Sequence, residues 1–201
     1  MIGIDVVDIQ DSGEPGWQHI RHLQRVASAE EQAWVKSRLR PDLALCVLWA
    51  AKEAAYKALS CPDRDEPFIP SGVAVCWQPD QLTGLCRWRG RQASVLARMD
   101  GYHAEALAVS EWANLHTLGC LYEVSRISGG SFPTPAQESL AARQLAASLL
   151  QRAGHPGGVI KRAVNGKPCL SGFPEVSLSL SHHGRWIAAA IALPREGNRQ
   201  V

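Results

Sequence analysis

LALCVLWAAKEAAYKAL, residues 43–59, is the stretch that does most to decide the fold. It is rich in alanine, leucine and lysine and contains neither glycine nor proline, so it predicts an α-helix of about four turns. A second alanine- and leucine-rich stretch, residues 136–153, predicts another helix in the later part of the 201-residue chain.

Short segments with the patterning of β-strands surround both helices. Residues 2–7 alternate and predict a first strand, and Ser28 with Glu31 forms a capping box that opens a short helix ending before Pro41. The mixture predicts an α+β fold. After the long helix we expect an antiparallel meander near 69–77, 83–88, 92–98 and 102–109. Further strands are expected at 118–125 and near 158–163, 176–180 and 186–193, with a loop at 128–135.

Strand, helix and final strand recur in the same order, which indicates an internal duplication. For the two helices taken alone, the alternative is that any two alanine-rich helices look alike by chance. We predict two pseudo-symmetric halves, residues 1–115 and 116–201, with an active site at the seam between them. The matched segments are 2–9 with 118–125, 49–59 with 140–150, and 101–109 with 184–192.

Composition excludes several classes of protein. Hydrophobic residues make up 46% and charged residues 20%, which is typical of a folded globular chain. A net charge of +2 is too small to indicate nucleic-acid binding. No apolar run reaches membrane-spanning length, and the N-terminus lacks the basic segment of a signal peptide, so a cytoplasmic location is expected. The six cysteines have no zinc-ligand spacing and are expected to be free thiols.

Charged side chains in the first half are candidates for a magnesium site. Asp5 lies inside an apolar strand, where an unpaired carboxylate is costly. Glu53 and Lys57 share a helix face, which Lys52 borders. Mg²⁺ prefers one or two protein carboxylates and completes its shell with waters and substrate phosphates. The alternatives are a buried aspartate that caps a loop and an ordinary solvated Glu–Lys pair. The second half has Leu121, Gln144 and Ser148 where the first has Asp5, Glu53 and Lys57, so we expect one active site.

Two polar segments lie in the second half. SLSLSHHGRW, residues 177–186, brings serine and histidine to the end of a strand, and NGKP, residues 165–168, predicts a turn that presents Lys167. A Ser–His hydrolase is disfavoured because neighbours on one turn do not easily make the nucleophile–base contact. The sequence contains no G-x-S-x-G elbow, Walker A loop or dinucleotide fingerprint.

Taken together, four motifs resemble those of the 4′-phosphopantetheinyl transferase superfamily. They are Gly3-Ile4-Asp5, Trp49 through Lys57, Gly166-Lys167-Pro168 and Ser181-His182-His183-Gly184. In the larger, surfactin-synthetase-type members the G-K-P half comes first, whereas here it comes second. The reversed order matches the much shorter holo-acyl-carrier-protein synthases. The resemblance therefore implies a pseudo-dimer that is circularly permuted near residues 112–117.

The resemblance implies an enzyme that transfers 4′-phosphopantetheine from coenzyme A to a serine of an acyl or peptidyl carrier protein, in fatty-acid or secondary-metabolite biosynthesis. Asp5 and Glu53 would hold Mg²⁺, and Glu53 would also be the base for the carrier serine, either directly or through metal-bound water. Val7 stands where larger members have a second acidic residue, and Asp8 points to the opposite strand face. Lys52 and Lys57 would contact the phosphates, Lys167 and Pro168 the adenosine, Ser181 and His182 the nucleotide end, with Arg143 a further candidate.

The implied partners are coenzyme A and an acidic carrier protein, and the implied state is a monomer. Asp5 and Glu53 should face His182 and Lys167 across the seam. Two interpretations are open for the basic residues of the first half: they steer the carrier, or they form an ordinary solvated face. These residues are Arg21, Arg25, Arg38 and Arg40. Two alternatives to the transferase are a catalytically degenerate module that binds coenzyme A or a carrier, and another Mg²⁺-dependent nucleotide enzyme such as a phosphodiesterase.

Overall fold

The structure is a computed structural model of the chain. It describes residues 1–10, 20–61, 66–79, 81–110, 118–129, 132–163 and 166–194. Trp112 and the predicted permutation junction at 112–117 therefore lie outside the described residues. Within them, helices are combined with antiparallel sheets, which confirms the predicted α+β class.

The first half contains a five-stranded antiparallel sheet with a long helix on one face. The strand order is β1-β5-β4-β3-β2, and neighbours from β2 to β5 follow one another in sequence, so the predicted meander is confirmed. The strands are β1 (Ile2–Asp8), β2 (Ala74–Trp77), β3 (Thr83–Trp88), β4 (Arg91–Met99) and β5 (His103–Ser110). The helices are α1 (Ile20–Val26), α2 (Ala29–Lys36), α3 (Pro41–Leu59) and the short 3₁₀ helix η1 (Pro70–Gly72).

The second half repeats the arrangement of a helix on a sheet. Helix α4 (Pro135–Arg152) packs on a three-stranded sheet with the order β6-β10-β9. Its strands are β6 (Leu118–Arg126), β9 (Ser177–His183) and β10 (Trp186–Pro194), and a separate hairpin is formed by β7 (Ile160–Arg162) and β8 (Pro168–Leu170). Duplication and the boundary at residue 115 stay predictions.

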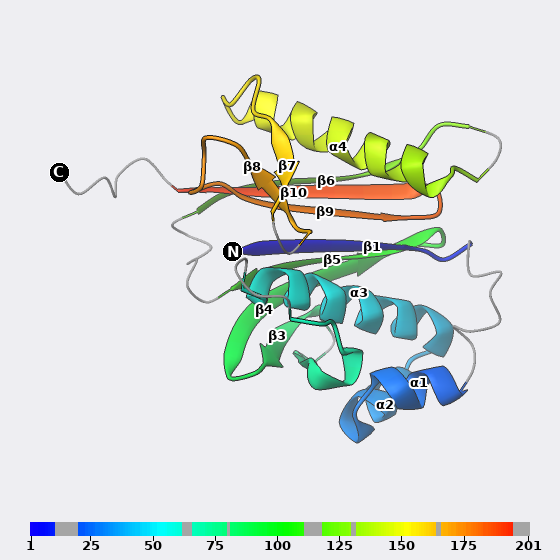
Figure 1. The fold of residues 1–201 in the computed structure, drawn as a ribbon. Coiled ribbons are helices and arrows are strands. Elements are labelled where there is room, and N and C mark those ends of the chain that lie inside the picture. The colour runs from blue at the N-terminus through cyan, green and yellow to red at the C-terminus, as the bar shows by residue number, and fades with distance from the viewer. Residues whose placement is uncertain are drawn as a thin grey trace.

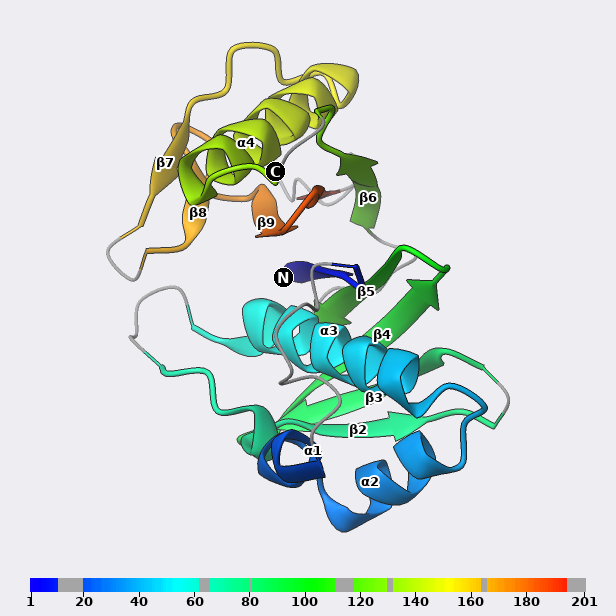
Figure 2. The same cartoon turned by 90° about the vertical axis from the view of Figure 1, so that its right-hand side faces the viewer.

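The two sheets pack between the two long helices, so the described elements form four layers in the order α3, sheet, sheet, α4 (Figures 1 and 2). Apolar side chains fill all three interfaces. The middle one joins Ile2, Ile4 and Val6 of β1 to Ala188 and Ala190 of β10. Edge strand β1 therefore lies at the centre of the molecule, where both halves meet.

Close packing of α3 on the sheet depends on small residues. The helix side chains at this contact include Ala50, Ala54 and Ala58, each 0% exposed. Gly3 of β1 faces them, and a Cβ atom built there would lie 2.0 Å from the carbonyl oxygen of Ala54. The G-I-D glycine is therefore required by the approach of the helix backbone, which brings the neighbouring Asp5 close to α3.

Strand β1 joins the second half through a row of side-chain acceptors. The N–H groups of Ile2 and Ile4 each donate to a serine hydroxyl of β9, Ser177 and Ser179 respectively, at 3.0 Å. Further along, Val6 N donates to Ser181 Oγ at 3.4 Å and Asp8 N to His183 Nδ1 at 3.1 Å. Alternate residues of β9 thus satisfy the edge of β1 that faces away from β5. We call this row the serine ladder.

No helix within the described ranges is both long enough and apolar enough to cross a membrane.

Candidate active site

Asp5, Glu53 and Lys57 form one cluster between β1 and α3. The Lys57 ammonium lies 2.8 Å from Asp5 Oδ1 and 3.1 Å from Glu53 Oε1, and it also donates to the carbonyl of Ile4 at 3.1 Å. Glu53 and Lys57 are one helical turn apart, and the approach at Gly3 brings Asp5 to the same place. The structure therefore brings together the three charged residues that the sequence predicts to share a site.

Burial makes the charge balance of this cluster unusual. Asp5 is only 3% exposed, and its desolvation, reinforced by the nearby Glu53 charge, raises its pKa to about 7 although Lys57 and Ser181 oppose the shift. Burial also disfavours the charged form of Glu53, but Lys57 outweighs it and the pKa of Glu53 is lowered. One ammonium is thus shared by two carboxylates. When both carboxylates are ionised the cluster carries a net negative charge, which a further cation would neutralise.

That donor set fits a divalent cation. The two carboxylates lie close enough for both to contact one ammonium, and the Glu53 side chain is 29% exposed, which leaves an approach from solvent. Among the described residues, no three His, Cys, Asp or Glu side chains gather as a metal site. Asp5 and Glu53 provide two carboxylates, the number that Mg²⁺ commonly takes when waters and phosphate oxygens complete its shell.

Two neighbours hold the carboxylates in place. Trp49 Nε1 donates to Glu53 Oε2 at 3.2 Å. Ser181 of β9 donates its hydroxyl proton to Asp5 Oδ1 at 2.6 Å, so one residue of the second half reaches the cluster. The resemblance assigned Ser181 to the nucleotide end, and its contact with Asp5 was not predicted. Sequence did carry a signal for it, because the alternation S-L-S-L-S places three serines on one strand face.

Lys52 lies elsewhere, in spite of its place next to Glu53 in the sequence. It is 0% exposed, pairs with Glu31 at 2.8 Å, and donates to the carbonyls of Pro70 and Val73. Glu31 is the residue of the predicted capping box, which the structure confirms at the start of α2. Phosphates could reach the Lys52 ammonium only by breaking this buried pair, so the expected contact between Lys52 and the phosphates is not supported.

We expect Lys52→Met to lower the free energy of unfolding by about 3–5 kcal/mol, because it leaves the Glu31 carboxylate buried without its counter-charge. Urea unfolding followed by circular dichroism measures the loss. The double variant Lys52→Met with Glu31→Gln should recover part of it, because both charges are then removed. A loss below about 1 kcal/mol in the single variant, as surface pairs show, would contradict the structural role.

His182 lies on the opposite side of β9 from Ser181. Its Nδ1 is 2.7 Å from Glu138 Oε2 of α4, and the side chain is 37% exposed. Successive residues of a strand point to opposite faces, so Ser181 and His182 cannot both face Asp5. The expectation that His182 faces Asp5 across the seam is therefore wrong, and Ser181 occupies that position.

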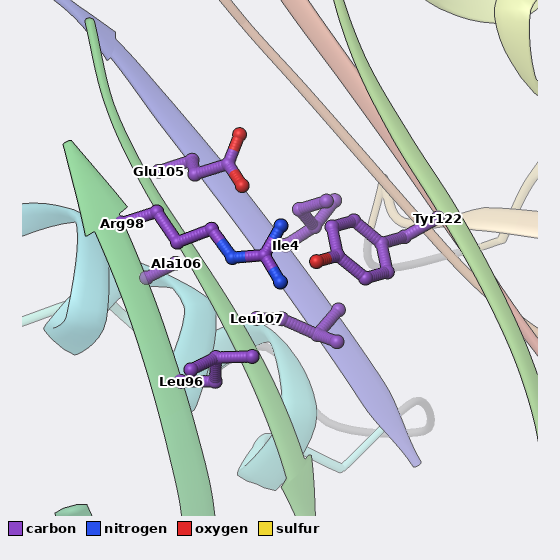
Figure 3. A pocket seen from close by; sticks show the side chains of 7 residues that line it. All are labelled: Ile4, Leu96, Arg98, Glu105, Ala106, Leu107 and Tyr122. Carbon is purple, nitrogen blue, oxygen red and sulfur yellow. The ribbon is translucent and has the colours of Figure 1, made fainter. Parts of the chain in front are cut away.

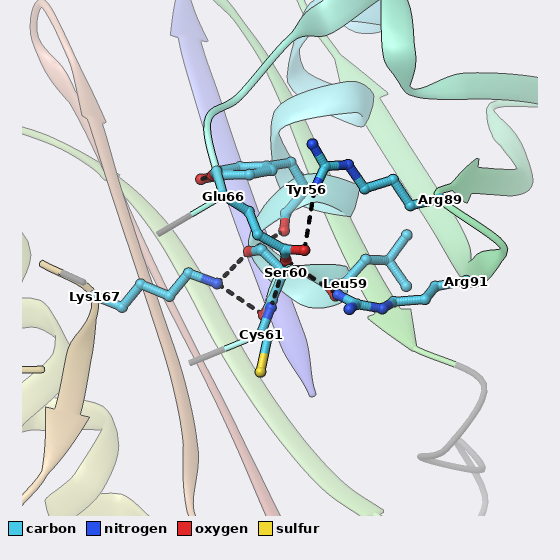
Figure 4. Close-up of polar contacts among 8 residues, drawn as sticks. All are labelled: Tyr56, Leu59, Ser60, Cys61, Glu66, Arg89, Arg91 and Lys167. Atoms are coloured by element: carbon cyan, nitrogen blue, oxygen red, sulfur yellow. Dashed lines mark hydrogen bonds and ion pairs between the residues drawn. The ribbon is translucent and has the colours of Figure 1, made fainter. Parts of the chain in front are cut away.

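Lys167 does cross the seam, and it meets the end of α3 (Figure 4). Its ammonium donates to the carbonyl oxygen of Ser60 at 3.0 Å and to the Ser60 hydroxyl. Arg91 Nη1 donates to the preceding carbonyl, that of Leu59, at 2.6 Å. Burial is the main reason why the pKa of Lys167 is lowered. These cations compensate the carbonyl end of the helix three residues beyond Lys57.

The carboxylate of Glu66 completes this second group of charges. Lys167 was predicted as a site residue from the sequence, but Glu66 and the two arginines were not. Glu66 lies 3.2 Å from Arg89 and 3.2 Å from Arg91, and the Tyr56 hydroxyl donates to its backbone carbonyl. Three cationic side chains thus gather around one carboxylate at the C-terminal end of α3 (Figure 4). The arginines come from the β3–β4 turn, so only the folded meander brings them to Lys167.

The remaining predicted residues lie in the second half. Pro168 begins β8 and pairs in register with Arg162, beside Lys167. Arg143 of α4 donates to the carbonyl of Ile160 at 3.4 Å, a contact within its own half. Asparagine 165 of the predicted turn lies outside the described residues.

A surface hollow between the sheets is not part of this cluster (Figure 3). It is lined by Ile4, which points to the other face of β1 from Asp5. The Arg98 guanidinium lies 6.0 Å from the ring centroid of Tyr122 and occupies the space between β4 and β6. The other lining residues are Leu96, Glu105, Ala106 and Leu107.

Comparison with known proteins gives one family match. The profile of the 4′-phosphopantetheinyl transferase superfamily matches residues 1–115, which include Asp5, Glu53 and Lys57. Helicobacter pylori holo-[acyl-carrier-protein] synthase in complex with coenzyme A is 23% identical over 55% of this chain and 100% of its own, with a TM-score of 0.44. The Thermotoga maritima holo-[acyl-carrier-protein] synthase is 18% identical over 87% and 86%, with a TM-score of 0.43. No curated protein matches the chain.

Proposed function

Because the chain belongs to the 4′-phosphopantetheinyl transferase superfamily, we propose that it transfers 4′-phosphopantetheine from coenzyme A to a serine of an apo acyl or peptidyl carrier protein. The observation that carries this proposal is the Asp5–Glu53–Lys57 cluster, which lies wholly within the residues matched by the family. Its charge and its access from solvent suit a magnesium-bound pyrophosphate.

Asp5 and Glu53 are the residues proposed to hold Mg²⁺. When bound, the ion neutralises the charge that grows on the departing 3′,5′-ADP. Lys57 sits between both carboxylates, and we propose that its ammonium turns toward a phosphate oxygen when the substrate binds. Its pKa is raised because the two carboxylates outweigh the effect of burial, so it carries its charge at neutral pH.

Glu53 is also the proposed base for the carrier serine. Its lowered pKa keeps it ionised at neutral pH, and its partial exposure allows a second protein to approach. The serine oxygen would form a bond to the β-phosphorus of the pyrophosphate as the bond to the 3′,5′-ADP oxygen breaks, and the hydroxyl proton would pass to the Glu53 carboxylate. The products are holo-carrier protein and 3′,5′-ADP.

Lys167 and Pro168 are proposed to contact the nucleotide end of coenzyme A. Lys167 reaches across the seam to the C-terminal end of α3, where Arg89 and Arg91 of the first half also lie, so a negatively charged nucleotide there would meet cations from both halves. Arg143 and His182 lie on the α4 side of β9, and we propose no contact between them and the reacting phosphates.

We expect Lys167→Met to raise the KM for coenzyme A about tenfold with a smaller change in kcat, because the lost charge contributes binding rather than transition-state stabilisation. Steady-state kinetics with varied coenzyme A measures both parameters. Lys167→Arg keeps the charge at the Ser60 carbonyl and should recover most of the affinity. An unchanged KM in a folded Lys167→Met variant would remove Lys167 from the binding site.

The proposed function is tested by incubating the protein with coenzyme A, Mg²⁺ and an apo-carrier and then weighing the carrier by mass spectrometry. A transferase adds the phosphopantetheine mass to the carrier and releases 3′,5′-ADP. A degenerate module would bind coenzyme A without any mass gain, and a phosphodiesterase would cleave coenzyme A without modifying the carrier. Because we propose that one chain contains the whole site, specific activity should not fall on dilution.

A further inference from the structure

We propose that Ser181 is a positioning residue for Asp5, and that through it the second half of the chain controls divalent-cation binding in the first. This inference rests on the proposed function, because it assigns the cation to the Asp5–Glu53 pair. It concerns a side chain for which the family resemblance implied a different contact, at the nucleotide.

Ser181 departs from the other serines of the serine ladder. Ser177 and Ser179 accept the N–H groups of Ile2 and Ile4 at 3.0 Å, as expected for neutral N–H···O bonds. At Ser181 the corresponding distance to Val6 N lengthens to 3.4 Å, while its own hydroxyl donates to Asp5 Oδ1 at 2.6 Å. The hydroxyl is therefore held mainly by the Asp5 carboxyl group, and the contact with β1 is secondary.

Both donors to the Asp5 carboxyl meet the same oxygen. Lys57 Nζ lies 2.8 Å from Oδ1, and Ser181 Oγ lies 2.6 Å from it, from the opposite half of the molecule. Two donors converging on Oδ1 fix the rotation of the carboxyl group and direct Oδ2 away from them. Oδ2 is then the oxygen left for the cation, and when Lys57 turns toward a phosphate, Ser181 is the donor that stays on Oδ1.

Burial allows this hydrogen bond to act as a constraint. Ser181 is 7% exposed and Asp5 is 3% exposed, so water cannot easily replace the hydroxyl. Residues that orient a metal ligand without touching the metal commonly change metal affinity by 10–100-fold when they are mutated, roughly the size of effect expected here. The first half alone would keep both carboxylates but lose the group that orients one of them.

Ser181→Ala tests this, with Ser179→Ala as its matched control. Ser179 is also buried, at 4% exposed, and accepts a β1 N–H in the same ladder, but it donates to no metal-binding carboxylate. The readout is Mn²⁺ binding to the full-length chain, measured by electron paramagnetic resonance without coenzyme A or carrier, since Mn²⁺ accepts the same oxygen ligands as Mg²⁺. The Mg²⁺ dependence of kcat is measured in parallel.

We expect Ser181→Ala to weaken Mn²⁺ binding about tenfold and to raise the Mg²⁺ concentration needed for half-maximal kcat by a similar factor. Ser179→Ala should stay within about twofold of wild type, since it removes only a ladder bond. Ser181→Thr keeps the hydroxyl and should restore binding. Equal weakening by both alanine variants, wild-type affinity in Ser181→Ala, or no Mn²⁺ binding by the wild type would overturn the inference.

The outcome for Ser181 is separable from the outcome for the transferase. If the wild type modifies the carrier but Ser181→Ala binds the cation as tightly as the wild type, the positioning role is wrong and the proposed function is unaffected. If Mn²⁺ binding depends on Ser181 but the protein never modifies a carrier, the positioning role holds and the proposed function is wrong. If Ser181→Ala fails to fold, Ser181→Cys gives the same comparison with a weaker donor in nearly the same volume.

Discussion

Gly3→Ala should strongly destabilise the fold. A Cβ atom at this position would lie 2.0 Å from the carbonyl oxygen of Ala54 and 2.8 Å from the amide nitrogen of Ala58. Both are backbone atoms of α3, so no side-chain rotation can make room, and the helix must move off the sheet. We expect the free energy of unfolding to fall by at least about 3 kcal/mol, the upper end of ordinary overpacking. Urea unfolding measures this loss.

The control for that substitution is Gly101→Ala, between β4 and β5. A Cβ atom there meets no atom within 4 Å beyond those of the residue itself and its two chain neighbours, and the residue does not need a left-handed backbone. The control variant should unfold at the same urea concentration as the wild type. If Gly3→Ala matched it, the close approach of α3 to β1 would not exist in solution, and the position of Asp5 beside Lys57 would lose its basis.

Elements defined by local pattern could be predicted from the sequence. The expected helix at 43–59 is α3 (Pro41–Leu59), and the expected helix at 136–153 is α4 (Pro135–Arg152). Both begin with a proline, one or two residues before the expected start, because proline is favoured in the first helical turn. The meander was predictable because turn residues punctuate its strands. Helix α1 (Ile20–Val26) was not predicted, because the sequence has no Ser, Thr, Asp or Asn directly before Ile20 to mark its start.

The cluster itself was predictable only in part. Glu53 and Lys57 share a face through helical periodicity, which sequence reveals, but Asp5 joins them only because the alanines and Gly3 allow α3 to approach. The pairing of Lys52 with Glu31 was not predicted, because the two residues are distant in sequence and spacing along α3 says nothing about a buried ion pair with α2. Non-local contacts of this kind are set by packing.

The position of His182 follows from the full length of β9. We expected a strand near 176–180, whereas β9 extends from Ser177 to His183. Continuing the alternation to the end of the strand puts His182 on the face of Leu178 and Leu180, which pack with α4, and puts Ser181 on the face of the serines. Once the strand is extended to His183, the alternation of its side chains places Ser181, and not His182, at the seam.

The Glu53→Gln variant should fold normally and lose transfer activity by two orders of magnitude or more. Glutamine keeps the shape of the side chain and an oxygen that can accept from Trp49 Nε1, and the position is partly exposed, so the cost in stability should be small. The amide removes a negative charge from a site with two carboxylates and cannot take the serine proton. Electrostatic deletions of this kind commonly cost about 100- to 1,000-fold in kcat.

Glu138→Gln is the matched control for Glu53→Gln, because it makes the same chemical change on the other long helix. Glu138 contacts His182 on the α4 side of β9, away from the Asp5–Glu53–Lys57 cluster, so its loss should leave kcat within about twofold. Both variants are assayed at saturating coenzyme A and ordinary Mg²⁺, with carrier modification followed by mass spectrometry. Wild-type turnover by Glu53→Gln would exclude Glu53 as both metal ligand and base, because neither role survives loss of the carboxylate charge. Equal losses in the two variants would instead mean that the reacting phosphates lie nearer α4 than the cluster predicts.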